Sequence, residues 1–384
     1  MRFVLIMTGI FYIIRAHKSM LLPFLRKDTK IRVGLDGGDY PLGLPVKNGI
    51  QRLVASTWGQ GVNNPTDSLK IFYYYFGRNH SAKQVITDIQ QILLPKKLFS
   101  SFFLPFRMYW DKIRIYVGFS GVLPPFVRLF RIKSIICIHD FAFMKYPAYF
   151  QNAIKMKWQT EYALYGADKI VVFSDYIKND IYSKYPTIPK DKIVRIYPGS
   201  DHLKLKRISK SIKSPFFIYV GVIKPMKNIE KLLELFDSYI KLSHDSLSKL
   251  VLLGSHEPIF FEQLTKTELF SKLKHRLLFK SNLEDTQLVE YYRSARAVLN
   301  TSHDEGFCYP VAEALRIGAR VIVNDLPLYN EFQKYYPAIT IAKDEDQFLA
   351  AMGRDEKPSN PIGAVPFTWS TFRDSMLRVI SDCI

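Results

Sequence analysis

The sequence is poor in cysteine and lacks a membrane-spanning apolar run, internal repeats and low-complexity tracts. Its three cysteines, Cys137, Cys308 and Cys383, form no C-x-x-C pair. Their spacing argues against a disulfide framework or a thiolate metal site and favours a reducing, cytoplasmic compartment. The unbiased composition indicates a globular protein, and 384 residues at roughly 150 per domain predict two domains.

The N-terminal apolar run, residues 1–14, is shorter than the roughly 20 residues that a membrane-spanning helix needs. Basic residues follow it in place of a small-residue cleavage site, which disfavours a signal peptide. Three interpretations stay open for the apolar and basic extension 1–30. It is an interfacial membrane anchor, a buried first strand or helix, or a segment ahead of a true start at Met20.

Acidic residues are also scarce, with 35 Asp and Glu against 54 Lys and Arg and a formal net charge of +19. The excess lies almost entirely in one half of the chain. Residues 1–200 hold 29 basic and 12 acidic residues, whereas residues 201–384 hold 25 and 23. A basic surface concentrates anionic partners, so we expect the N-terminal half to meet nucleic acid, phospholipid headgroups or a pyrophosphate.

Short apolar runs alternate with helical patterns from Ile31 onwards, which is typical of βαβ units around parallel sheets. The polar, basic segment 203–214 separates two such series and is typical of a linker. The expected strands are 31–35, 69–75, 113–117, 134–138, 169–173, 192–196, 216–220, 249–253, 276–279, 297–300 and 321–323. The sequence therefore predicts an α/β fold in which two Rossmann-like domains, residues 31–202 and 215–365, face a central cleft.

Residues 302–318 (SHDEGFCYPVAEALRIG) follow an expected strand, with Pro310 near a helix start and Gly318 at its end. Backbone N–H groups at such a helix start favour an anion, so we expect a diphosphate over residues 306–309. Two carboxylates, Glu305 and Glu313, flank the loop at a separation of at most roughly 12 Å. Carboxylates accept hydrogen bonds from vicinal diols, so one sugar at each end of the diphosphate is chemically sensible.

The pattern E-G-F-x-x-P-x-x-E-A, residues 305–314, resembles the E-x7-E motif of glycosyltransferase family 4. That family is the retaining "glycosyl transferases group 1" type with the GT-B fold. Other segments match it in the same order: IRVGLDGG (31–38), KNGIQR (47–52), IHDFAFMKYP (138–147), ADKIVVFSDYIKNDI (167–181), YVGVIKPMKN (219–228), VLLGS (251–255) and RVIVNDLPLYNE (320–331). Each match alone is weak, but the ordered set covers residues 31 to about 380.

The resemblance implies a donor site in the C-terminal domain. Lys227 would pair with the donor diphosphate and stabilise the leaving group. Lys224 would supply a second cation, because Met226 stands where the family commonly has arginine. Glu305 would bind the hydroxyls of the donor sugar and Glu313 the nucleotide ribose. The structural alternatives are that Lys227 is an exposed lysine at a helix start, that Glu305 caps a helix, and that Glu313 is a solvated residue on a helix.

The donor-binding set is completed by Gly306, Phe307, Cys308 and Tyr309. Cys308 stands where the family commonly has glycine, so its side chain would narrow the choice of donor. His139 would face the transferred sugar near the anomeric centre, and Asp140 would hold the loop. Gly49 would lie close to donor and acceptor. A structural histidine and an ordinary turn glycine are the alternatives for His139 and Gly49.

No metal or cofactor is expected besides the nucleotide sugar, which is the donor substrate. A D-x-D pattern at residues 344–346 precedes the helical pattern QFLAAM. Carboxylates favour the positive end of a helix, so we interpret this pattern as a helix start.

The segment 93–110 (LLPKKLFSSFFLPFRMYW) interleaves aromatic and aliphatic residues with basic ones, which suits a surface that dips into a lipid interface. The alternative is an aromatic core with a solvated basic edge. No nucleic-acid recognition module accompanies the segment, so nucleic-acid binding is not expected.

These features predict a metal-independent, retaining hexosyltransferase that acts on a glycan or lipid-linked saccharide in bacterial surface polysaccharide (lipopolysaccharide) assembly, peripheral at the inner face of the membrane. Mannose is the first choice of sugar, because the H-D…P and IKPMKN segments resemble bacterial mannosyl- and rhamnosyltransferases. The alternatives are a GT-B nucleotide-sugar epimerase and a catalytically inactive, basic membrane-binding GT-B protein. The resemblance also implies that a final helix within residues 366–384 crosses back to the first domain, so the cleft would close about 203–214 and 365–368.

Overall fold

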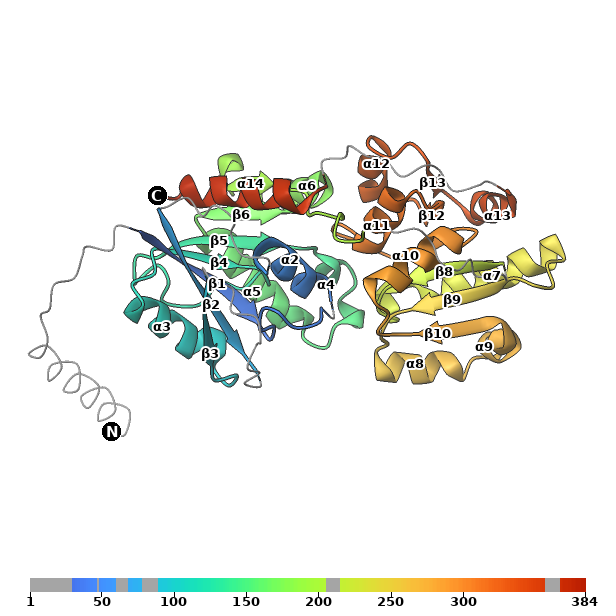
Figure 1. Ribbon diagram of the computed structural model, residues 1–384, viewed down its shortest axis with the longest axis horizontal. Helices are drawn as coiled ribbons and strands as arrows, with labels where there is room; N and C mark the ends of the chain where they lie inside the picture. Colours follow the sequence, from blue (N-terminus) through green and yellow to red (C-terminus); the bar gives the residue numbers. More distant parts are fainter. Residues whose placement is uncertain (1–29, 47, 60–67, 78–88, 205–214, 356–366) are drawn as a thin grey trace, which may run out of the picture.

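The computed structural model describes residues 30–46, 48–59, 68–77, 89–204, 215–355 and 367–384. Within these ranges the chain forms two α/β domains that lie side by side (Figure 1). The predicted extension before residue 30 lies outside the described residues, as do residues 205–214 of the linker and residues 365–366 of the second hinge.

The N-terminal domain is built on a sheet of seven described strands, in the order β3-β2-β1-β4-β5-β6-β7, and its neighbouring strands pair in parallel. The strands are β1 (Ile31–Gly38), β2 (Leu69–Phe76), β3 (Ile89–Leu94), β4 (Ile115–Gly118), β5 (Lys133–Ile138), β6 (Lys169–Val172) and β7 (Ile193–Arg195). Strand β5 is buried from its second residue to its last. Such a near-continuous apolar run is typical of a parallel sheet covered on both faces.

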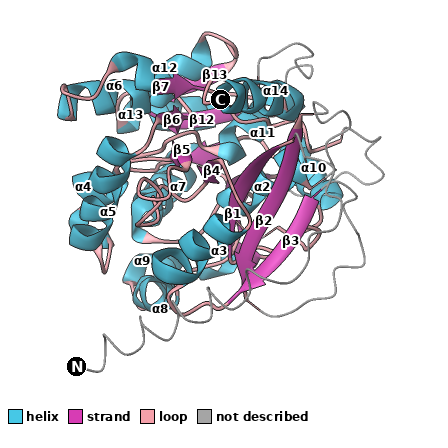
Figure 2. Ribbon diagram, turned by 90° about the vertical axis from the view of Figure 1, so that its left-hand side faces the viewer, coloured by secondary structure: helices cyan, strands magenta, loops and turns pink. Residues whose placement is uncertain are grey.

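Helices cover both faces of this sheet. One face carries α2 (Gly49–Trp58) and α14 (Trp369–Ser381). The other carries α3 (Leu104–Trp110), α5 (Ala153–Gly166) and α6 (Asp175–Lys184), together with the single-turn α4 (Ala142–Lys145). Shorter turns are the π-helical Phe99–Phe103 and the 3₁₀ turns Pro147–Tyr149 and Lys190–Lys192. In Figure 2, β1, β2 and β3 run side by side at one edge of the sheet.

The C-terminal domain has six described strands in the order β10-β9-β8-β11-β12-β13. They are β8 (Phe216–Val220), β9 (Lys249–Leu253), β10 (Leu277–Lys280), β11 (Val298–Asn300), β12 (Val321–Asn324) and β13 (Ile339–Ala342). Its helices are α7 (Ile229–Ser243), α8 (Pro258–Thr265), α9 (Glu268–Leu273), α10 (Asp285–Ser294), α11 (Tyr309–Ile317), α12 (Pro327–Gln333) and α13 (Glu345–Gly353). The 3₁₀ turns are Pro225–Lys227 and Lys274–Arg276.

The strand order reverses once in each sheet, between β1 and β4 and between β8 and β11. Open parallel sheets bind ligands outside the carboxyl ends of their strands at such a reversal. Both domains therefore offer a binding edge, and the two edges face each other.

Helix α14 follows the C-terminal domain in sequence but packs on the N-terminal domain (Figure 1). The chain therefore crosses between the domains twice. The two crossings are joined, because Ser200 N donates to Phe367 O at 2.9 Å and Trp369 N to Asp201 Oδ1 at 2.8 Å. A Cβ atom on Gly199 would lie 2.4 Å from Trp369 N, so this close approach requires glycine.

The predicted α/β architecture is confirmed, and each of the eleven predicted strands overlaps an observed one. Two strands were missed. Strand β3 lies at an edge of its sheet and contains Gln90 and Gln91, which interrupt its apolar pattern, and β13 is an edge strand of four residues. The D-x-D pattern begins α13 as predicted, with Asp344 accepting a hydrogen bond from Gln347 N at 2.8 Å.

Candidate functional site

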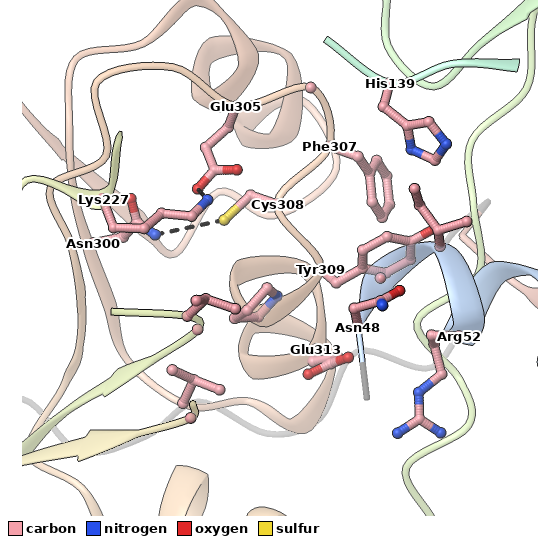
Figure 3. Close-up of a pocket in the computed structure, with 18 of the residues that line it drawn as sticks. Asn48, Arg52, His139, Lys227, Asn300, Glu305, Phe307, Cys308, Tyr309 and Glu313 are labelled. Atoms are coloured by element: carbon pink, nitrogen blue, oxygen red, sulfur yellow. Dashed lines mark hydrogen bonds and ion pairs between the residues drawn. The ribbon is translucent and has the colours of Figure 1, made fainter. Parts of the chain in front are cut away.

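A cleft of about 520 Å³ lies between the two domains at the carboxyl ends of their strands (Figure 3). All ten predicted site residues line it: Gly49, His139, Lys224, Lys227, Glu305, Gly306, Phe307, Cys308, Tyr309 and Glu313. They come from the loops after β1, β5, β8 and β11 and from the first turns of α11. The sequence motifs thus converge on one cavity, although 264 positions separate Gly49 from Glu313.

The loop between β11 and α11 carries the E-x7-E motif. Cys308 precedes α11 with a φ of 55°, in the left-handed region that favours glycine. Pro310 lies in the first turn and Gly318, at φ 84°, follows the last, as predicted. Among the described residues, none accepts a hydrogen bond from the backbone N–H of Phe307, Cys308 or Tyr309. These N–H groups form the positive end of the helix and suit an anion.

A turn after β8 brings Lys227 against this loop. The hydroxyl of Thr301 donates to the carbonyls of Lys227 and Asn228, at 3.3 and 3.0 Å. The N–H of His303 donates to Met226 O at 3.0 Å. These hydrogen bonds therefore hold the turn and the motif loop together.

Lys227 and Glu305 form an ion pair, with Lys227 Nζ 2.5 Å from Glu305 Oε1 (Figure 3). Burial is the largest single influence and disfavours both charged forms. The charge of each partner together with the hydrogen bonds to it exceeds this effect, so the pKa of Lys227 is raised and that of Glu305 is lowered. Ser302 Oγ also donates to Oε1, at 2.7 Å, and no described residue donates to Oε2. Glu305 is therefore ionised, with one oxygen left for a ligand.

The sequence assigned Lys227 and Glu305 to different parts of the donor and did not predict their pairing. Lys224 lies close enough for its pKa to be lowered by burial and by the charge of Lys227. Two lysines and one carboxylate therefore share this end of the cleft, which keeps an excess of positive charge beside the free N–H groups of the α11 start.

Glu313 lies on α11 at the other end of the motif and is buried. Tyr292 OH donates to its Oε2 at 3.1 Å, and His202 Nε2 lies 3.2 Å from its Oε1. Neither His202 nor Tyr292 was predicted as part of the site. Only their tertiary positions reveal them, because neither belongs to a motif segment that the sequence analysis identified.

His139 projects from the end of β5 toward the cleft (Figure 3). Its Nε2 lies 2.5 Å from Phe119 O, and because a carbonyl only accepts, Nε2 carries the proton. Burial lowers the pKa of the imidazole, so His139 is neutral near pH 7. Asp140 Oδ1 accepts from Ala142 N at 3.0 Å and so holds the loop, as predicted.

Helix α2 begins at Gly49 and meets α11 across the cleft. A Cβ atom on Gly49 would lie 3.2 Å from the ring of Tyr309, which is tight contact. Asn48 caps the helix by accepting from Gln51 N at 2.9 Å, and Arg52 pairs with Asp285 at 3.0 Å across the cleft mouth. Asn48 and Arg52 line the cleft without having been predicted. The N-x-x-Q spacing is a capping signal that identifies Asn48.

The two domains are in direct contact behind the motif loop, and this contact is called the domain seam below. Ser174 Oγ donates to Gly306 O at 2.7 Å, and a Cβ atom on Gly306 would lie 1.7 Å from His139 O. Lys145 Nζ lies 3.2 Å from Asp304 Oδ1. Glycine at position 306 is therefore required by contact with the opposite domain.

Comparisons with known proteins agree with this architecture. A sucrose-phosphate synthase from Thermosynechococcus elongatus superposes with a TM-score of 0.68 at 17% identity, covering 92% of this chain and 99% of that one. Anabaena HepE in complex with UDP and glucose superposes with a TM-score of 0.66 at 12% identity, covering 92% of this chain and all of that one. The fold is the GT-B fold of glycosyltransferases, as predicted.

Residues 203–352 match the model of the family described as glycosyl transferases group 1, which confirms the predicted family resemblance. The O-antigen chain mannosyltransferase RfbU of Salmonella typhimurium is 26% identical over 228 residues. That match covers 58% of this chain and 62% of RfbU, so this chain spans less than two thirds of that relative's length.

Proposed function

We propose that this chain is a retaining glycosyltransferase that moves a hexose from a nucleotide diphosphate sugar to a glycan or lipid-linked saccharide. The proposal rests on one arrangement in the cleft. The Lys227–Glu305 ion pair lies beside the N–H groups at the start of α11, which have no acceptor among the described residues, and Glu313 lies about one turn further along that helix. Cations and N–H groups suit a diphosphate, and a carboxylate at each end suits two sugars.

The proposed reaction exchanges one bond at the anomeric carbon for another. The bond from C1 to the diphosphate oxygen breaks, and a bond from C1 to the acceptor oxygen forms on the same face of the sugar. The acceptor proton passes to the departing diphosphate. Lys227, Lys224 and the N–H groups of residues 307–309 stabilise the charge that develops there. Glu305 orients the hexose, and neutral His139 lies on the side of the hexose that faces the N-terminal domain. In this proposal no side chain acts as a covalent nucleophile and no metal takes part.

Mannose is the proposed hexose, and surface polysaccharide assembly is the proposed setting. RfbU, an O-antigen chain mannosyltransferase, supports both choices. The alternatives are the epimerase and the inactive membrane-binding protein. An epimerase inverts a centre of the nucleotide sugar with no acceptor, whereas the inactive protein turns over nothing. The order of the sequence motifs favours transfer over epimerisation, and the intact Glu305, Glu313, Lys227 and His139 weigh against the inactive protein.

A screen of nucleotide sugars tests this proposal. We expect one of GDP-mannose, UDP-glucose, ADP-glucose and dTDP-rhamnose to raise the midpoint of thermal unfolding, with GDP-mannose first, because a ligand that binds the folded state stabilises it. At 100 times the dissociation constant the stabilisation is about 2.7 kcal/mol. A flat response to all four sugars at millimolar concentration would contradict the proposed donor site.

We also propose that the N-terminal domain binds an anionic membrane from the cytoplasmic side. Residues 93–131 hold seven Lys or Arg and one acidic residue, Asp111. The segment 93–110 is divided: Phe99, Leu104 and Met108 are buried, whereas Trp110 is 64% exposed. The segment therefore contributes both to the core and to an exposed aromatic surface.

Helix α5 extends the exposed apolar surface. Its outer face carries Ile154, Trp158 and Tyr162 at a spacing of four residues, and Trp158 is 71% exposed. Lys155 and Lys157 flank them. Helices α3 and α5 pack their inner faces into the same core cluster, so their outer faces lie on the same side of the domain. No helix in the described ranges is long and apolar enough to cross a membrane.

Cosedimentation with vesicles tests the membrane proposal. Binding to phosphatidylglycerol vesicles at low salt should fall as salt rises and should be absent with phosphatidylcholine alone. Trp158→Ser should weaken it roughly tenfold or more, because a large apolar side chain leaves the interface. Ile259→Ser, on the exposed face of α8 in the other domain, is the matched control. Failure of the unaltered chain to bind at low salt would refute the membrane contact.

A further inference from the structure

His202 lies between the two interdomain crossings and Glu313. It follows the segment at residues 199–201 that is joined to the second crossing at residues 367–369. Its side chain and that of Glu313 are each only 9% exposed. His202 does not line the cleft, so it can influence a ligand only through a residue that does.

The two ring nitrogens of His202 have different neighbours. Trp369 Nε1 donates to Nδ1 at 3.3 Å, so Nδ1 is an acceptor and the ring proton of the neutral imidazole is on Nε2. That nitrogen lies 3.2 Å from Glu313 Oε1, a close contact that lacks the geometry of a hydrogen bond, and it has no other partner among the described residues. The indole of Trp369, from the second crossing, therefore selects the tautomer whose proton is on the nitrogen beside the carboxylate.

The Glu313 carboxylate is thus contacted from two sides: Tyr292 OH donates a hydrogen bond to Oε2, and His202 Nε2 lies in electrostatic contact with Oε1. An ionised carboxylate accepts about four hydrogen bonds, two on each oxygen. The Tyr292 hydrogen bond and the His202 contact restrict rotation of the carboxylate and leave acceptor positions on both oxygens for a ligand. Two such positions match the 2′- and 3′-hydroxyls of a ribose.

We propose that His202 is a positioning residue for the nucleotide ribose. It fixes the Glu313 carboxylate in the orientation that receives both ribose hydroxyls, and it ties that carboxylate to the two crossings through Trp369. This role rests on the proposed function, because it assumes a nucleotide donor whose ribose lies at Glu313.

Calorimetric binding of GDP and 2′,3′-dideoxy-GDP, with UDP and 2′,3′-dideoxy-UDP in parallel, tests the role. The unaltered chain should bind the ribonucleotide about tenfold more tightly than its dideoxy form. His202→Ala should weaken ribonucleotide binding by about tenfold and leave dideoxynucleotide binding unchanged, so that discrimination disappears. His202→Gln, which keeps an N–H donor, should restore part of the discrimination between the ribonucleotide and its dideoxy form.

His275→Ala, at an exposed histidine of the C-terminal domain, is the control and should behave like the unaltered chain. If His202→Ala weakens binding of the ribonucleotide and of its dideoxy form equally, the substitution has caused a general loss of structure, and the positioning role is overturned. Unchanged discrimination in His202→Ala would overturn it as well. If the unaltered chain binds none of GDP, UDP, ADP and dTDP, the proposed function itself fails, and this outcome differs from both of the others.

Discussion

Lys227→Met is expected to lower kcat by about 10²–10³-fold, the usual loss when one group that stabilises a developing negative charge is removed. Methionine keeps the length and most of the volume of lysine and removes the charge. The donor diphosphate then departs without its nearest cation. Initial rates of nucleoside diphosphate release, measured with saturating donor and acceptor, report the effect.

The same substitution is expected to destabilise the ligand-free protein by about 3 kcal/mol, because it leaves the buried Glu305 carboxylate without its cation. Adding Glu305→Gln removes that unpaired charge, so the double variant should recover stability in urea unfolding without recovering turnover. Lys231→Met is the matched control. Its ammonium pairs with Glu345 at an exposed site, where ion pairs contribute little. A Lys227→Met rate within threefold of the unaltered rate would exclude Lys227 from leaving-group stabilisation.

Gly306→Ala is expected to lower turnover about 10²-fold while each domain stays folded. The new methyl group would lie 1.7 Å from His139 O, a backbone atom that cannot rotate away. The seam must open, which moves the loop with Glu305 away from His139, and a misplacement of about 1 Å can cost that factor in rate. Turnover and small-angle scattering, which detects a wider separation of the domains, are the measurements.

Gly353→Ala provides the control for Gly306→Ala. An added Cβ at position 353 meets no atom within 4 Å, so turnover and domain separation should both be unchanged. Circular dichroism checks that both variants keep their helix content. Full turnover by Gly306→Ala would show that the closed seam of this structure is not the arrangement in which the reaction occurs.

The predicted site was identifiable from sequence because its residues belong to local motifs. A strand, a loop and a helix start are adjacent in the chain, so the position of Glu305 relative to residues 306–309 follows from spacing alone. Glu313 follows equally, since it lies on the same helix. The convergence of such segments on one cleft is a consequence of parallel topology, in which the loops after successive strands share one edge.

Contacts between distant segments were not predictable in the same way. The pairing of Lys227 with Glu305 spans 78 positions and depends on Thr301, which joins the two loops. Likewise, His202 reaches Glu313 only because the two crossings are joined beside α11. No pattern of composition or spacing encodes these distances.

Helix α5 shows a second reason why some features could not be predicted from the sequence. Its inner face buries Ala163 and Leu164, while its outer face exposes Trp158 and Ile154, so apolar residues surround the helix. An apolar residue on such a helix can be core or surface, and periodicity cannot distinguish the two. The sequence pattern therefore indicated the exposed aromatic residues within 93–110 and not those on α5.

Release of nucleoside diphosphate by the unaltered chain and by Glu305→Ala shows whether the cleft at Glu305 is the site of glycosyl transfer. Both proteins are incubated with the nucleotide sugar that stabilises the unaltered chain most and with a saccharide acceptor. We expect acceptor-dependent release by the unaltered chain and a loss of at least 10²-fold in Glu305→Ala, because the hexose loses the carboxylate that orients it. Undiminished turnover in Glu305→Ala would contradict the proposed site.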